Sequence, residues 1–220
     1  MSLEVIEIET APHPTASVIV LHGLGADGND FVPVAEELDL RPVGPVRFVL
    51  PHAPTRPVTI NGGYVMRAWY DILGTDLAKR EDEEGLRQSL TSVQALIERE
   101  RDRGLKASRI VLMGFSQGCA MVLLAGLRHG ERLAGLVGLS GYLPLAATTA
   151  AERNPANNDV PIFLAHGRSD TVIPIDRALA SRDVLVALGY EVEWHEYPMQ
   201  HSVCAQEIVD LNRWLLRVLS

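Results

Sequence analysis

Residues 109–118 read RIVLMGFSQG, and an apolar run, CAMVLLAGL, follows directly at 119–127. The first five residues favour a buried strand over 109–113, and the apolar run favours a helix over 116–129. Between them, Gly114-Phe115-Ser116-Gln117-Gly118 is a G-x-S-x-G pattern, and a strand–turn–helix unit is the context that such a pattern requires if its serine is a nucleophile. The alternative is that Ser116 only caps the helix. The context favours a Ser116 hydroxyl exposed at the carboxyl edge of a sheet.

The rest of the chain alternates between strand-like and helix-like segments. Residues 51–80 show no clean period, and 141–159 are interpreted as a polar loop. Strands are predicted over 3–9, 17–21, 46–50, 133–139, 160–165 and 190–197, and helices over 31–38 (with Asp30 as its cap), 81–103, 175–188 and 205–219. This alternation predicts an α/β fold, with a mostly parallel twisted sheet and helices on both faces. No repeat or linker divides the chain, so we expect one domain over residues 1–220.

The composition narrows the classes of function. The 220 residues include 20 Lys and Arg against 28 Asp and Glu, a net charge of −8 that disfavours nucleic acids and anionic membranes as partners. The longest apolar stretch, 120–127, is far too short to span a bilayer, so stable membrane insertion is not expected. Two cysteines, Cys119 and Cys204, favour free thiols in a reducing compartment. With no signal-peptide pattern at the start, we expect a cytoplasmic protein.

A serine nucleophile needs a histidine base and an acid that orients it, and in a fold of this kind the chain order is serine, acid, histidine. His195 lies inside a predicted strand beside glutamates, on what reads as a solvated face, whereas His201 follows the strand's end. Asp170 follows the strand over 160–165 by a short turn. The other aspartates in this region lie at the wrong edge or inside a helix, namely Asp159, Asp176 and Asp183. The sequence therefore predicts Asp170 and His201 as the partners of Ser116.

Acyl transfer also needs backbone donors for the oxyanion that forms on the carbonyl oxygen. One donor should be the N–H that follows the nucleophile, at Gln117, and the other should come from a loop after an early strand. The glycine-rich segment 22–25 is such a loop, and its spacing favours the N–H of Leu24, with His22 as a structural residue. We see no metal-ligand spacing and no phosphate loop with its lysine, so we expect no metal site.

Six motifs in order carry a family resemblance. They are His22-Gly23-Leu24-Gly25-Ala26-Asp27-Gly28, Arg67-Ala68-Trp69-Tyr70-Asp71, Gly114-Phe115-Ser116-Gln117-Gly118, Leu139-Ser140-Gly141-Tyr142-Leu143-Pro144, His166-Gly167-Arg168-Ser169-Asp170 and His201-Ser202. From about Ser17 to the end, the chain resembles the phospholipase/carboxylesterase family, which includes bacterial carboxylesterases and acyl-protein thioesterases. The resemblance implies a compact α/β-hydrolase fold without a large cap domain. It supports the Ser116–Asp170–His201 triad, oxyanion donors at Leu24 and Gln117, no cofactor, and homodimers. One departure is Cys119, where many members have glycine.

We expect a serine carboxylesterase that hydrolyses short- to medium-chain esters through an acyl-enzyme on Ser116. The short chain leaves little for a lid, which predicts a shallow, open site. Candidates for an apolar acyl wall are Trp69, Ile72, Leu73 and Val172, although plain core packing explains each of them equally well. An acyl-protein thioesterase or a lysophospholipase is the alternative within the same chemistry, since a triad does not read the leaving atom. A catalytically inactive hydrolase-fold binding protein is the alternative from another class, and the intact triad argues against it.

Overall fold

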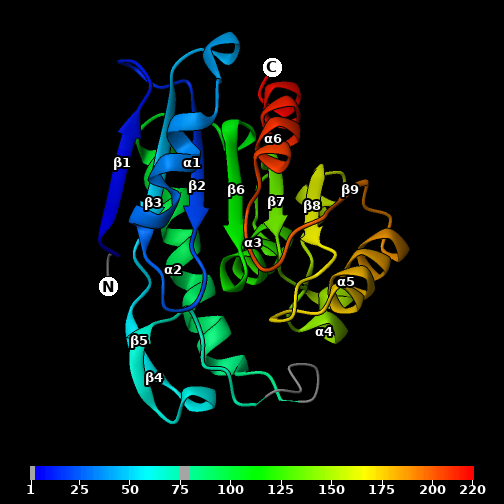
Figure 1. Ribbon diagram of the computed structural model, residues 1–220. Helices are drawn as coiled ribbons and strands as arrows, with labels where there is room; N and C mark the ends of the chain where they lie inside the picture. Colours follow the sequence, from blue (N-terminus) through cyan, green and yellow to red (C-terminus); the bar gives the residue numbers. More distant parts are fainter. Residues whose placement is uncertain (1–2, 75–79) are drawn as a thin grey trace.

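The computed structural model describes residues 3–74 and 80–220. Its main sheet has seven strands in the order β1-β3-β2-β6-β7-β8-β9 (Figure 1). The bounds are β1 Val5–Glu9, β2 Ala16–Leu21, β3 Val46–Pro51, β6 Ile110–Phe115, β7 Gly135–Leu139, β8 Ile162–Gly167 and β9 Val192–Tyr197. Only the β1–β3 pair of this sheet is antiparallel, which confirms the predicted, mostly parallel sheet. The carboxyl ends of β6, β8 and β9 therefore meet at one edge.

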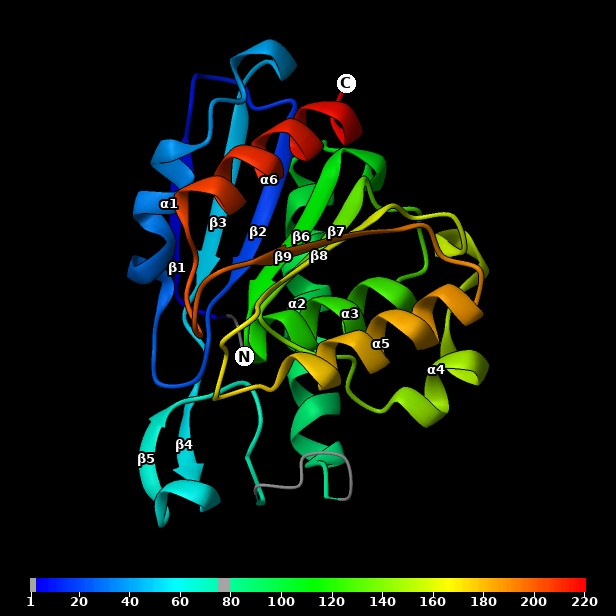
Figure 2. The same ribbon diagram turned by 45° about the vertical axis from the view of Figure 1, so that its right-hand side comes forward.

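Helices cover both faces of the sheet, as predicted (Figure 2). The bounds are α1 Val32–Glu37, α2 Glu83–Asp102, α3 Gln117–Arg128, α4 Ala146–Glu152, α5 Ile175–Ala187 and α6 Ala205–Val218. Successive side chains of β2 point to opposite faces, because the side-chain period of a strand is two. Ile19 and Leu21 join the core shared with α2, α3 and α5, whereas Val18 and Val20 join the core shared with α1 and α6. The two apolar layers hold the sheet edge in a fixed geometry.

The prediction of a loop throughout 141–159 is wrong. Residues 146–152 form α4, which starts after Leu145 in a left-handed conformation. Its sequence, AATTAAE, has good helix propensity but offers no apolar stripe, so periodicity does not reveal it. Tertiary contacts hold it in place: Glu152 pairs with Arg128 at 2.8 Å and with Arg87 at 2.8 Å.

The segment without a clean period folds back on itself. Strands β4 (Thr55–Val58) and β5 (Tyr64–Arg67) form an antiparallel hairpin, separate from the main sheet, around a short 3-10 turn at Thr59–Asn61. Gly62 and Gly63 both have positive φ, which allows this tight reversal. Residues 75–79 of the predicted segment 51–80 lie outside the described residues.

The start of α1 differs from the prediction. Asp27, rather than Asp30, occupies the cap of the short 3-10 helix Gly28–Phe31 that precedes α1. Asp30 is the reciprocal partner: its Oδ2 accepts a hydrogen bond of 2.8 Å from the Asp27 N–H. The two aspartates form a capping box, in which each side chain satisfies a backbone donor that the helix leaves free.

Glu207, in the first turn of α6, is a buried carboxyl group that makes stability depend on pH. The residue is 0% exposed, and neither side-chain oxygen finds a hydrogen-bond partner among the described residues. Burial raises the pKa of Glu207 from 4.5 to about 8. The folded state thus holds a proton that the unfolded state releases, and stability should fall as the pH rises from about 4.5 to about 8.

Replacing Glu207 with glutamine should remove this penalty, because the amide is neutral at every pH. We expect the free energy of unfolding to rise by roughly 3 kcal/mol at pH 7, and by less than about 1 kcal/mol at pH 5. Urea unfolding of both proteins at pH 5, 6, 7 and 8 measures the difference, with the exposed Glu36→Gln as the control. A stability change that is the same at all four pH values would contradict a buried, protonated Glu207.

Candidate active site

Ser116 lies in a sharp turn between β6 and α3. Its φ of 56° and ψ of −116° fall in a region that residues other than glycine rarely adopt. Close packing requires the flanking glycines: a Cβ at Gly118 would lie 1.9 Å from the carbonyl oxygen of Leu21, and one at Gly114 would lie 2.3 Å from the Gly118 carbonyl carbon. The Ser116 N–H donates to the carbonyl of Leu139 at the end of β7 (2.9 Å). The strained turn therefore presents the hydroxyl at the carboxyl edge of the sheet.

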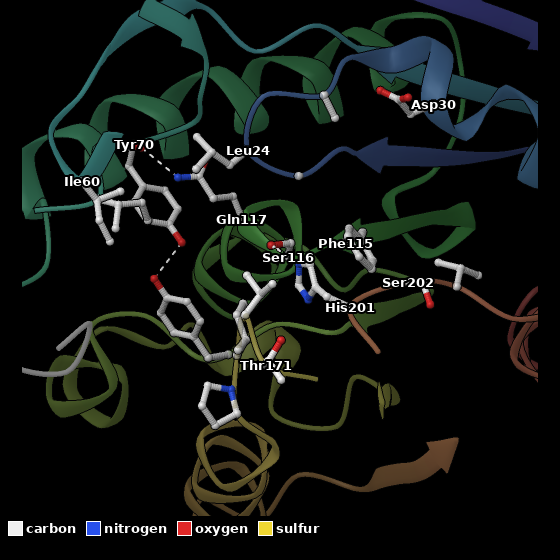
Figure 3. Close-up of a pocket in the computed structure, with 18 of the residues that line it drawn as sticks. Leu24, Asp30, Ile60, Tyr70, Phe115, Ser116, Gln117, Thr171, His201 and Ser202 are labelled. Carbon is white, nitrogen blue, oxygen red and sulfur yellow. Dashed lines mark hydrogen bonds between the residues drawn. The ribbon is translucent and has the colours of Figure 1, made fainter. Parts of the chain in front are cut away.

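The three residues predicted to act together are brought together. Asp170 follows β8, and His201 lies between β9 and α6. The Nδ1 of His201 is 2.7 Å from Asp170 Oδ2. Its Nε2 is 3.0 Å from Ser116 Oγ, and both of these side chains are labelled in Figure 3. A carboxylate beside Nδ1 favours the tautomer in which Nδ1 carries the hydrogen, which leaves Nε2 free to accept the proton of the serine. The arrangement can generate an alkoxide-like serine.

The backbone fixes the acid from its other side. Asp170 Oδ1 accepts hydrogen bonds from the N–H groups of Val172 and Ile173, both at 2.9 Å. His166, at the end of β8, lies 3.4 Å from Asp170 Oδ2 and donates from Nε2 to the carbonyl of Ile173 at 2.8 Å. Burial lowers the pKa of His166, so the ring is neutral. Sequence reasoning missed this support, although the spacing of four residues from His166 to Asp170 is visible.

The Leu24 and Gln117 N–H groups lie at the same pocket as the serine. Both residues line it, and within residues 3–74 and 80–220 neither N–H donates to a protein acceptor. His22 supports the Leu24 loop: its Nδ1 donates to the carbonyl of Gly23 (2.7 Å), and its Nε2 accepts from the Ala53 N–H (3.0 Å). Burial lowers the pKa of His22, which keeps the ring neutral and the loop fixed. The pocket that contains Ser116 is therefore also lined by two residues whose backbone N–H groups have no protein acceptor among the described residues.

The four predicted wall residues divide into two pairs. Ile72 and Val172 line the pocket, whereas Trp69 and Leu73 do not. Trp69 is 0% exposed, and its indole N–H donates to the carbonyl of His22 at 2.9 Å. Its backbone N–H donates to the side-chain oxygen of Gln117 at 3.0 Å. Trp69 thus stabilises the start of the Leu24 loop and the Gln117 side chain through hydrogen bonds. The prediction that Trp69 forms an acyl wall is therefore wrong.

The pocket is larger than the predicted shallow site. Its volume is about 850 Å³, toward the upper end of the range for small-molecule sites. Most of its lining is apolar and includes Leu24, Phe31, Val34, Ile60, Ile72, Phe115, Ile173, Pro174 and Val203. Tyr70 and Tyr142 share a buried hydrogen bond of 2.8 Å in its wall (Figure 3). Sequence reasoning did not predict this pair, because the two tyrosines are 72 positions apart and only the fold joins them.

His195, which is the alternative histidine, and the two cysteines are not part of the Ser116–His201–Asp170 hydrogen-bond chain. His195 is packed rather than solvated, since its ring stacks on Phe163 at 4.9 Å and its side chain is 28% exposed. Cys119 is buried beneath the serine turn, and a Cβ at Gly138 or Gly141 would lie within 2.7 Å of its sulfur. Two glycines therefore make room for Cys119, and burial raises its pKa to about 12, so it is an inert thiol. Cys204 is half-buried at the start of α6.

Residues 3–74 and 80–220 contain no cluster of three or more His, Cys, Asp or Glu side chains suited to a metal ion. None of their helices is long and apolar enough to cross a membrane.

Known proteins share both the sequence and the fold. The model of the family described as Phospholipase/Carboxylesterase matches residues 2–219. The chain is 42% identical to acyl-protein thioesterase 1 of Yarrowia lipolytica over 206 residues, which covers 91% of each chain. The crystal structure of Zea mays acyl-protein thioesterase 2 superposes with a TM-score of 0.88 at 29% identity, covering 99% of each chain. That of esterase PE8 gives 0.83 at 25% identity, covering 99% of this chain and all of that one.

The fold and the matched sequence define an α/β hydrolase that acts on carboxylic esters. The chain belongs to the phospholipase/carboxylesterase family. The resemblance predicted from its six motifs is thereby confirmed.

Proposed function

We propose that this protein is a serine thioesterase that releases acyl groups from thiols, with Ser116 as nucleophile, His201 as base and Asp170 as its orienting acid. The observation that carries the catalytic part is the hydrogen-bond chain from Asp170 through His201 to Ser116, at 2.7 and 3.0 Å. The choice of thioester over oxygen ester is supported by relatives of 39–42% identity that are named acyl-protein thioesterase 1. We therefore propose a thioesterase in place of the short- to medium-chain carboxylesterase that was expected from the sequence.

The geometry supports an acylation step through Ser116. His201 Nε2 takes the proton from Ser116 Oγ as the oxygen attacks the acyl carbonyl carbon, and the Leu24 and Gln117 N–H groups receive the oxyanion. The imidazolium that forms is stabilised by the Asp170 carboxylate at Nδ1. Collapse of the tetrahedral intermediate breaks the bond to the leaving sulfur, which takes the proton from Nε2. An acyl group then remains on Ser116 as an ester.

Water completes the cycle by the same route. It enters on the His201 side after the thiol has left, and Nε2 removes one of its protons as its oxygen attacks the Ser116 ester. The oxyanion again lies between the two N–H groups. When the intermediate collapses, Ser116 Oγ recovers its proton from Nε2 and the carboxylic acid departs. Each proton taken by His201 is returned, so the protein needs no other acid or base.

The pocket supports apolar acyl groups. Ile60, Ile72 and Ile173 line it, and each methylene of an acyl chain that they bury adds up to about 0.8 kcal/mol. We therefore expect kcat/KM to rise from acetyl to octanoyl thioesters. Rates on a C2 to C16 thioester series measure this; a maximum at C2 would contradict an extended acyl site.

A matched pair of substrates tests the thioester choice. Octanoyl groups on ethanethiol and on ethanol differ only in the leaving atom, and the protein should hydrolyse the thioester with the higher kcat/KM after correction for the hydroxide-catalysed rates. An S-octanoyl cysteine peptide gives the same test on a peptide. A higher corrected rate on the ethanol ester would favour the oxygen-ester reading, and no hydrolysis of either would favour an inactive binding protein.

A further inference from the structure

The leaving-group side of the pocket can be identified from the mechanism. His201 must return its proton to the leaving atom, so the leaving group has to lie beside His201 Nε2. The neighbour of the His201 ring on this side is Phe115, with ring centroids 4.7 Å apart. The ring centroids of Phe31 and Phe115 are 6.1 Å apart. Asp30 directly precedes Phe31 in the sequence. All four residues line the same pocket, with Phe115, Ser202 and Asp30 on the side of Ser116 away from Ile60 and Tyr70 (Figure 3).

Asp30 gives this side a negative charge. It is the one carboxylate among the residues that line the pocket, and its side chain is exposed. Oδ2 is used by the Asp27 N–H, but Oδ1 has no hydrogen bond, and no arginine or lysine within the described ranges pairs with it. Asp27, at the other end of the capping box, adds a second negative charge nearby. The net charge of the whole chain is −8, so it does not offset the negative potential on this side of the pocket.

The two phenyl rings act in the same direction as the carboxylate. An aromatic face attracts a cation within about 6 Å, by roughly 0.5–1 kcal/mol at an exposed site. Phe31 and Phe115 are tilted by 48° to each other, and both line the pocket together with Asp30 and His201. Two rings followed by an unpaired carboxylate are the chemistry that recognises alkylammonium groups.

We propose that this side of the pocket, formed by Asp30, Phe31 and Phe115, selects leaving groups that carry a positive charge a few bonds beyond the reacting sulfur. Such groups include a thiol bearing an alkylammonium and a cysteine peptide with a neighbouring lysine or arginine. This inference rests on the proposed thioesterase function and specifies its substrate class. Anionic leaving groups are disfavoured by the same field.

Three butyryl thioesters of equal spacing test the proposal. Butyrylthiocholine carries a trimethylammonium group, the ester of 3,3-dimethylbutane-1-thiol is its neutral carbon isostere, and the ester of 2-mercaptoethanesulfonate is anionic. Their thiols differ in intrinsic reactivity, so each substrate is compared between the wild type and a variant, which cancels that difference. Thiol release is measured at low salt.

Asp30→Asn removes the charge and keeps an oxygen for the Asp27 N–H. We expect kcat/KM to fall roughly 3- to 5-fold for butyrylthiocholine, to stay unchanged for the isostere, and to rise for the sulfonate. Asp30→Lys should enlarge both changes, and Phe31→Leu should lower the thiocholine rate alone by about 2- to 5-fold. Glu36→Gln removes an exposed charge on α1 outside the pocket and should alter none of the three. In 0.5 M NaCl the Asp30 effects should largely vanish.

An equal change for all three substrates in Asp30→Asn would overturn the proposal, because the carboxylate would then act only as a helix cap. Failure of the thioesterase function is distinguishable from this result. If the wild type hydrolyses no thioester but does hydrolyse p-nitrophenyl butyrate, the leaving-atom assignment fails. The same charge comparison then proceeds with butyrylcholine and 3,3-dimethylbutyl butyrate, and equal effects of Asp30→Asn on that pair would overturn the proposal there as well.

Discussion

Replacing Ser116 with alanine is expected to lower kcat by roughly 10⁴- to 10⁶-fold on any substrate that the protein hydrolyses. The reason is specific to the turn: Oγ is the atom 3.0 Å from His201 Nε2, and without it the base has nothing to deprotonate except water. The Ser116 N–H would still bond to the carbonyl of Leu139, so the turn should persist. Release of p-nitrophenol from the acetate, butyrate and octanoate esters measures the loss.

Ser140 supplies a matched control for this experiment. It also follows a strand, β7, has a positive φ of 48°, and is fully buried, but its hydroxyl has no hydrogen-bond partner among the described residues. Ser140→Ala therefore introduces alanine into a similarly strained position without touching the reacting atoms, and we expect nearly full activity. If Ser116→Ala retained the wild-type rate while remaining folded, Ser116 would not be the nucleophile.

The second large effect is expected from Asp170→Asn, with kcat reduced by roughly 10²- to 10⁴-fold. The Val172 and Ile173 N–H groups hold Oδ1, so the asparagine oxygen should take that place and its NH₂ group should face His201 Nδ1. A donor at that position favours the tautomer in which Nδ1 accepts and Nε2 carries the proton. His201 then presents a donor to Ser116 Oγ and cannot act as its base, even though no atom has moved far.

Asp159→Asn is the control for the charge and for strand β8. Asp159 lies before the strand, at the opposite edge, and pairs with Arg132 at 3.1 Å. Its replacement should change the rate by less than about twofold, because an exposed ion pair contributes little. NMR of the His201 ring nitrogens in Asp170→Asn would report the tautomer directly. Retention of the wild-type tautomer together with a wild-type rate would remove Asp170 from the proposed mechanism.

The candidate triad was accessible to sequence reasoning because each member directly follows a strand. Ser116, Asp170 and His201 come from β6, β8 and β9, and parallel strands bring such positions to one edge whatever the details of packing. Their separation in the chain, up to 85 residues, does not obscure this regularity. The same logic covers the seven main strands and the long amphipathic helices, whose bounds differ from the predicted ones by only a few residues.

What escaped prediction depends on contacts between distant segments. Helix α4 has no apolar period and is held by ion pairs to α2 and α3. Trp69 carries the side chain expected of a pocket wall, but its indole N–H finds the His22 carbonyl 47 residues away and turns the ring into the core. The Tyr70–Tyr142 pair is invisible for the same reason. Local patterns specify where a strand ends; they do not specify which neighbour a side chain meets there.

The loop after Asp170 divides its tasks between backbone and side chains. The N–H groups of Val172 and Ile173 orient the acid, while Val172 also lines the pocket and is 62% exposed. Every residue except proline supplies the same N–H, so position 172 is free to change in size and polarity without disturbing the triad. A lineage, or a designer, can therefore retune which acyl groups are accepted here one substitution at a time, while the reaction itself is inherited intact.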